Sequence, residues 1–124
     1  MKSISFLAII LATLLVSCQT MQINTPTATP DLSNIPTDIP IYPDPIHWMV
    51  LSQGAAYQAH ADLQTITKFY QTEMLNQGWS QSQEPITYDT TAIVLHYEKA
   101  DRKVLINIET TSKEGILVIG IGWE

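Results

Sequence analysis

The sequence predicts one small α+β domain, in which a single helix packs on a twisted antiparallel sheet. Three observations predict this fold class. Apolar residues recur with helical spacing between residues 63 and 77, and after residue 92 they alternate with polar ones at the period of a strand. Short polar turns separate the alternating stretches, as in antiparallel hairpins. The expected order is two strands, one helix and then a three- or four-stranded meander.

The helix has a clear beginning and end in the sequence. Its apolar face carries Leu63, Ile66, Phe69, Tyr70 and Met74. Asp62 precedes it and is a good N-cap, because its carboxylate can accept hydrogen bonds from the free amides of the first turn. Gly78 stands where a helix needs a left-handed residue, and Trp79 follows where it can contact Met74 across a Schellman turn. We therefore expect a helix over residues 63–77.

The strands are predicted by alternation. After the helix, alternating runs begin at Ile93, Val104 and Ile116, with polar turns at residues 100–102 and 112–115. Before the helix, residues 47–52 and 55–60 flank Gln53-Gly54 and are typical of another hairpin. A further strand can begin at residues 79–83. In the last strand, Gly120 and Gly122 are expected to leave room for an aromatic ring or for the helix.

The N-terminus has the features of an export signal. After Lys2, residues 4–16 run without a charge. As a helix they cover only about 20 Å, too short for a hydrocarbon core of roughly 30 Å, so a signal peptide is the better interpretation than a spanning helix. Leu15-Val16-Ser17-Cys18 resembles the lipobox of bacterial lipoproteins. The resemblance implies a signal peptide over residues 1–17 and lipidation of Cys18, the only cysteine of the chain.

The lipidated cysteine implies a location. We expect the protein in the cell envelope, held outside the cytoplasm by its N-terminal lipid. Gln19, by the same resemblance, allows the outer membrane if the cell is Gram-negative; otherwise the outer face of the cell membrane is expected. Residues 18–38 are predicted to form a Thr/Pro-rich tether, because six of the seven prolines lie at positions 26–45. The folded domain is then expected at residues 39–124.

The charge of the chain excludes some partners. The formal net charge is −6, and the basic residues are scattered. A nucleic-acid-binding protein needs a basic stripe, and docking on anionic lipid needs a basic patch, so neither is expected. The membrane contact is therefore expected to be the lipid alone.

No motif in the sequence predicts catalysis or a cofactor. The sequence contains no H-E-x-x-H, no G-x-S-x-G and no complete phosphate loop, so we expect neither an enzyme nor a bound cofactor. One metal hypothesis stays open. If Gln53-Gly54 is a two-residue loop, His47 faces His60 across the hairpin, at a Cβ separation of about 5 Å that would let two imidazoles share a cation. The alternative is two exposed edge histidines.

Aromatic residues are the remaining candidates for binding. A domain of this size needs most of its tryptophans and tyrosines for its core, Trp79 above all. Trp48 and Trp123 stand near the ends of expected strands and are the better candidates for an exposed binding patch.

The domain also resembles a module of bacterial lipoproteins from Chloroflexi and cyanobacteria. The residues that carry the resemblance are Ile39-Pro40-Ile41-Tyr42-Pro43, Phe69-Tyr70, Leu75 and Gly78-Trp79. It covers residues 39–124 and implies a fold and a location but no activity. The leading hypothesis is a non-catalytic, membrane-tethered module that binds an envelope protein or peptide through a sheet face or edge. The alternative is an accessory protein that binds a small ligand or a metal through His47 and His60.

Overall fold

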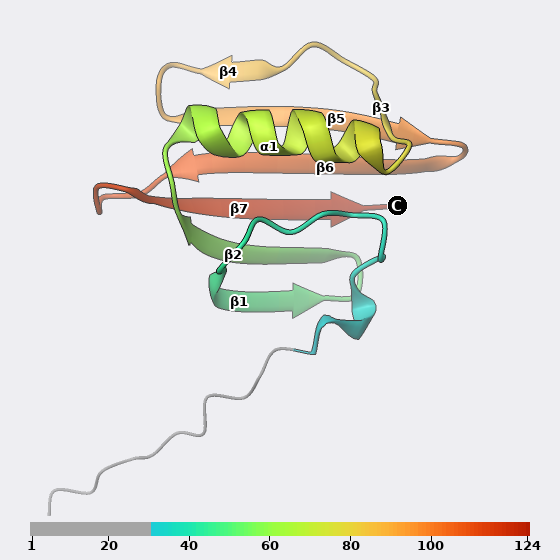
Figure 1. Ribbon diagram of the computed structural model, residues 1–124, viewed down its shortest axis with the longest axis horizontal. Coiled ribbons are helices and arrows are strands. Elements are labelled where there is room, and N and C mark those ends of the chain that lie inside the picture. The colour runs from blue at the N-terminus through green and yellow to red at the C-terminus, as the bar shows by residue number, and fades with distance from the viewer. Residues whose placement is uncertain (1–30) are drawn as a thin grey trace, which may run out of the picture.

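The computed structural model describes residues 31–124 (Figure 1). Its elements are a 3-10 helix η1 (Leu32–Asn34), strands β1 (Ile46–Leu51) and β2 (Gly54–His60), helix α1 (Leu63–Asn76), and strands β3 (Ser80–Gln81), β4 (Ile86–Tyr88), β5 (Ala92–Lys99), β6 (Arg102–Thr110) and β7 (Ile116–Trp123). The predicted signal peptide, Cys18 and the first part of the predicted tether lie outside the described residues. Within the described part of the chain, no helix has the length and apolar character needed to cross a membrane.

The strands form one seven-stranded sheet in which every pair is antiparallel. The order is β1-β2-β7-β6-β5-β3, and β4 also pairs with β5. The last strand, β7, lies between β2 and β6, so the meander β5–β6–β7 joins the N-terminal hairpin into one continuous sheet. The predicted α+β fold, with one helix on an antiparallel sheet, is confirmed. The region after the helix adds two short strands, β3 and β4, to the three long ones.

The predicted ends of the helix are confirmed. The Asp62 carboxylate accepts a hydrogen bond from the amide of Thr65 at 2.8 Å. At the other end, Gly78 has a φ of +83°, and the amide of Trp79 donates to the carbonyl of Met74 at 2.9 Å. The amide of Gly78 donates to Leu75, which completes a Schellman turn. The turn places Trp79 beneath the end of the helix, where its ring is buried.

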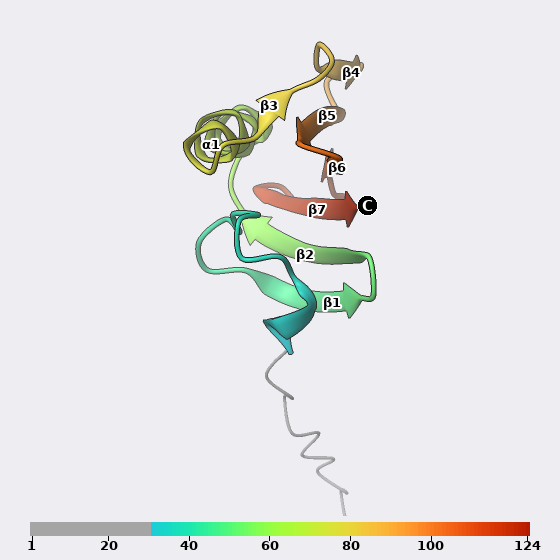
Figure 2. The ribbon, with the colours of Figure 1, turned by 90° about the vertical axis from the view of Figure 1, so that its right-hand side faces the viewer.

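The hydrophobic core fills the space between α1 and one face of the sheet. Its largest fully buried side chains are Trp79, Tyr57, Tyr70, Tyr97, Ile66, Met74, Leu95, Ile106, Ile108 and Ile119. The segment before β1, residues 31–45, also packs on this face and is called the strap (Figures 1 and 2). Ile35 and Ile39 of the strap are only 8% and 4% exposed. The folded part therefore begins several residues before the predicted boundary at residue 39.

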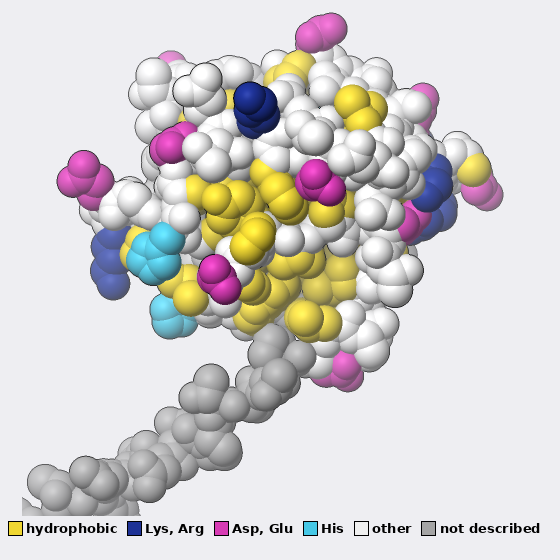
Figure 3. All heavy atoms as spheres, viewed as in Figure 1, with side chains coloured by type: hydrophobic (Ala, Val, Ile, Leu, Met, Phe, Trp, Pro, Cys, Tyr) yellow, Lys and Arg dark blue, Asp and Glu magenta, His cyan; other side chains and the backbone are white. Residues whose placement is uncertain are grey.

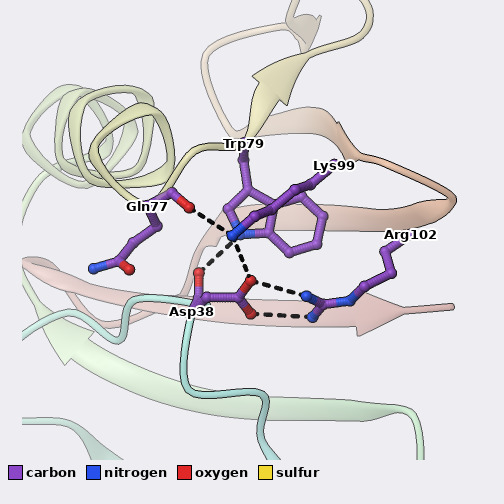
Figure 4. Close-up of polar contacts among 5 residues, drawn as sticks. All are labelled: Asp38, Gln77, Trp79, Lys99 and Arg102. Atoms are coloured by element: carbon purple, nitrogen blue, oxygen red, sulfur yellow. Dashed lines mark hydrogen bonds and ion pairs between the residues drawn. The ribbon is translucent and has the colours of Figure 1, made fainter.

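A charged cluster fastens the strap to the sheet (Figure 4). The Asp38 carboxylate accepts hydrogen bonds from Lys99 Nζ at 2.9 Å and from both terminal nitrogens of Arg102 at 2.8 and 3.0 Å. Its main-chain carbonyl accepts the indole N–H of Trp79 at 2.8 Å. The Arg102 guanidinium, helped by Lys99, lowers the pKa of Asp38 to about 2, so this carboxylate is charged at any physiological pH.

The other face of the sheet is not covered by any described element. Figure 2 shows the sheet with α1 and the strap on one side only. The expectation for Gly120 and Gly122 is wrong: a Cβ added at either position would find no atom within 4 Å. Because residues alternate between faces along a strand, these glycines point away from the core that buries Leu117, Ile119 and Ile121. They make room for nothing within the described part of the chain.

Candidate ligand groove

In the structure His47 and His60 are not direct cross-strand partners. β1 pairs with β2 two residues out of the predicted register, with Leu51 opposite Gly54, and the ladder begins with Ile46 opposite Gln58. A β-bulge lies between Ile46 and Met49, and within it His47 has a φ of +52°. His60 pairs instead with Ile116 of β7. The predicted register is therefore wrong, and the metal hypothesis loses the geometry on which it depended. Among the residues from 31 onward, no group of three or more histidine or acidic side chains could hold a metal ion.

The two tryptophans predicted to form an exposed patch are half-buried. Trp48 stacks on Tyr57, with ring centroids 4.8 Å apart and an interplanar angle of 29°. Trp123 pairs with Val104, and both tryptophans pack against the hydrophobic core. Neither indole forms the exposed surface that the sequence suggested, and a role of either in binding stays a prediction.

A groove between α1 and the β4–β5 hairpin is the candidate site. We call it the α1–β5 groove; it has a volume of about 580 Å³. Its helix side carries Leu63, Gln64, Thr67, Lys68 and Gln71. Its other side carries Thr87, Asp89, Thr90 and Ile93. Small-molecule sites in proteins usually measure roughly 300–1,000 Å³, so the groove has the size of a ligand site.

Local structure explains how the two sides are placed. The apolar face of α1 turns Ile66 and Tyr70 into the core, which leaves the next stripe of the helix at the rim of the sheet. Across the gap, a turn at Tyr88–Thr91 with Asp89 in the left-handed region reverses the chain from β4 into β5. The amide of Thr110 in β6 donates to the carbonyl of Thr91 at 2.8 Å and ties this turn to the sheet.

The lining of the groove combines apolar walls with polar and charged side chains. Leu63 and Ile93 are partly buried against the core and provide apolar walls, while Lys68 and Asp89 supply one charge of each sign. The other lining side chains are three threonines and two glutamines, which can donate and accept hydrogen bonds. Such a groove can hold an apolar body and place a polar group near Lys68.

Sequence reasoning did not find this groove. The predictions that Leu63 lies in the helix and Ile93 in a strand are confirmed. The helical and strand patterns do not show that a groove remains between α1 and the β4–β5 hairpin. The turn at residues 88–91, which forms the second wall, has no strong turn motif such as Asn-Gly.

One family model matches most of the described domain. The family model described as START domain-like matches residues 52–115. This span contains β2, α1 and β3 to β6, and therefore every residue that lines the α1–β5 groove. No curated protein and no solved structure matches the chain. The match extends over more than half of the sequence, and the chain belongs to the START domain-like family.

Proposed function

We propose that this chain is a lipid-anchored, non-catalytic binding module that takes up an amphipathic small molecule, such as a fatty acid, in the α1–β5 groove. The observation that carries the proposal is the groove itself, about 580 Å³ in volume and lined entirely from the span that matches the START domain-like family. Leu63 and Ile93 suit the apolar part of such a ligand. Lys68 suits an anionic head group.

The groove lies far from the end of the domain that joins the predicted tether, so a ligand can reach it without passing the anchor. In Figure 1 the described chain begins beside β1, at one edge of the sheet, and β4 lies at the other edge. The α1–β5 groove is next to β4 and so lies far from the point where the preceding segment joins the domain. A tether that ends beside β1 leaves the groove free.

Binding in the groove is tested by filling it. Thr67 lies in its helix wall, and Thr67→Trp should lower the affinity for oleate, offered below its critical micelle concentration, by at least about tenfold. Thr72→Trp is the matched control, because Thr72 is an exposed residue of the same helix outside the groove. Titration calorimetry gives the affinities, and amide chemical shifts locate the ligand. Equal affinity in the two variants, or no saturable binding by the unmodified chain, contradicts the proposal.

The lipid anchor is tested at Cys18. The lipobox-like sequence and the lack of any other cysteine favour acylation there. In the producing bacterium, Cys18→Ser should abolish incorporation of radiolabelled palmitate and move the chain out of the detergent phase of a Triton X-114 partition. Ser17→Ala, which keeps a small residue before Cys18, should leave both unchanged. Unaltered labelling of the Cys18 variant would show that the anchor lies elsewhere.

A further inference from the structure

The face of the sheet opposite α1, which we call the open face, carries two adjacent uncharged rows of side chains. Strand pairing places Leu51, Gly54, Gly122, Leu105 and His96 in one row. It places Met49, Ala56, Gly120, Asn107 and Val94 in the next. Both rows run from β1 to β5, and neither contains Asp, Glu, Lys or Arg. Charged residues are depleted in the same way at the centres of protein interfaces.

Several apolar side chains of these rows are exposed to solvent. Met49, Leu51 and Leu105 are 59%, 58% and 42% exposed. Between them, Gly120 and Gly122 leave open space above β7. Glycine weakens a strand interior and often marks a place where another backbone approaches closely. The open face therefore has the character of a surface that is covered by a partner.

Small and large residues divide the open face into two halves. β2 and β7 present Gly54, Ala56, Gly120 and Gly122. β5 and β6 present Val94, His96, Leu105 and Asn107. A two-fold axis that runs parallel to the strands, between β6 and β7, would lay each half on the other half of a second copy. We propose that the open face is the interface of a homodimer with this axis.

The geometry makes specific contacts. Rotation about this axis leaves the position of each residue along its strand unchanged. β6 of one copy therefore faces β7 of the other copy, and β5 of one copy faces β2 of the other. Leu105 then packs over Gly122 of the second copy, and Val94 over its Ala56. Two sheets packed face to face are separated by about 10 Å, a gap that large residues against small ones can fill without voids.

Charge at one rim of the open face is complementary under the same axis. Lys103 of β6 and Glu124, which follows β7, exchange two backbone hydrogen bonds and so share one row. The axis places Lys103 of each copy opposite Glu124 of the other. This gives two symmetry-related pairs of opposite charge beside the uncharged centre. Such pairs fix register more than they add affinity.

The size of the face predicts a weak dimer. Five strands spaced about 4.8 Å apart, with two central rows and their flanks, give a buried surface on the order of 500 Å² per copy. Specific interfaces bury roughly 800 Å² per partner, so we expect a micromolar dissociation constant. Tethering on one membrane raises the effective concentration of the second copy.

Sedimentation velocity on the chain from residue 19, which keeps every described residue, tests this proposal between roughly 5 and 500 µM. The unmodified chain should pass from monomer to dimer in this range. Gly122→Leu should weaken the dimer at least tenfold, because it fills the space needed by Leu105 of the second copy. It should not lower the melting temperature, since a Cβ at Gly122 meets nothing within 4 Å. The double variant Gly122→Leu with Leu105→Ala exchanges the large and the small side chain of this contact. It should restore association.

Leu105→Glu and Leu75→Glu form a matched pair on opposite sides of the domain, because both leucines are exposed, by 42% and 58%. Only the first should produce a monomer. The proposal is overturned if the unmodified chain stays monomeric throughout, if Gly122→Leu associates as well as the unmodified chain, or if both glutamate variants weaken it equally. Binding of a monomeric chain to phosphatidylcholine vesicles through this face would also overturn it.

Discussion

Replacing Trp79 by alanine should lower the free energy of unfolding by about 3–5 kcal/mol. Trp79 is 1% exposed and fills the space beneath the C-terminal end of α1. Its indole N–H also holds the strap through the carbonyl of Asp38, and the guanidinium of Arg102 lies 4.8 Å from its ring centroid. The substitution therefore leaves a cavity and removes a hydrogen bond and a cation–π contact at once. The total stability of a domain of this size is only about 5–15 kcal/mol.

Urea unfolding followed by circular dichroism gives the loss of stability, and Leu75→Ala is the control. Leu75 lies on the same helix but is 58% exposed, so its truncation should cost less than about 1 kcal/mol. Trp79→Phe separates the two effects of Trp79, because it keeps most of the ring and removes the N–H that binds Asp38. In this variant the amide of Ile39, next to Asp38, should exchange its hydrogen faster than in the unmodified chain. A loss below 1 kcal/mol for Trp79→Ala would contradict the packing described above.

The features that sequence analysis predicted correctly are those set by residues close together in the chain. Asp62, Gly78 and Trp79 fix the ends of α1 through contacts within one turn. The meander was predictable for the same reason, because alternation decides which residues of β5, β6 and β7 face the core. The resemblance to a module of bacterial lipoproteins stays a prediction. Membership of the START domain-like family, in contrast, follows from the match over residues 52–115.

The features that were missed depend on contacts between distant residues. A bulge at His47 changes the register of β1 against β2. The sequence around His47 does not indicate that this residue has a positive φ. Residues 31–38 of the strap are predicted as part of the tether, because the proline-rich composition masks the apolar anchor Ile35. The ion pairs of Asp38 join it to residues more than sixty positions away, Lys99 and Arg102, and no local pattern predicts them.

The second large effect is expected at alkaline pH. Burial raises the pKa of Tyr57 and Tyr70 above the usual value of 10.0, and raises the pKa of Tyr97 to about 12. A tyrosine with a raised pKa in the folded state contributes stability that is complete below the unfolded-state pKa. This contribution is lost as the pH rises above 10 toward the folded-state pKa. Deprotonation of Tyr97 in the unfolded state alone costs up to about 1.4 kcal/mol of stability per pH unit in this window.

Burial of Tyr57 and Tyr70 adds to the loss from Tyr97 in the same direction, because it also raises their pKa in the folded domain. The domain should therefore lose stability as the pH rises above 10. When it unfolds, tyrosinate absorbance at 295 nm and far-ultraviolet circular dichroism should change together. Titration of these tyrosines without loss of the dichroism signal would contradict the expectation.

Two substitutions distinguish burial from hydrogen bonding in this transition. Among residues 31–124 the hydroxyl of Tyr97 has no hydrogen-bond partner. Tyr97→Phe should therefore be neutral or stabilising at pH 7, and above pH 10 it should reduce the slope of stability against pH by one proton. The hydroxyl of Tyr57 bonds Tyr70 at 2.6 Å and accepts the amide of Tyr42 at 2.9 Å. Tyr57→Phe leaves both groups without this partner and should cost about 1–3 kcal/mol already at pH 7. If Tyr97→Phe destabilises the domain as much as Tyr57→Phe, the buried hydroxyl of Tyr97 makes a contact that its desolvation does not explain.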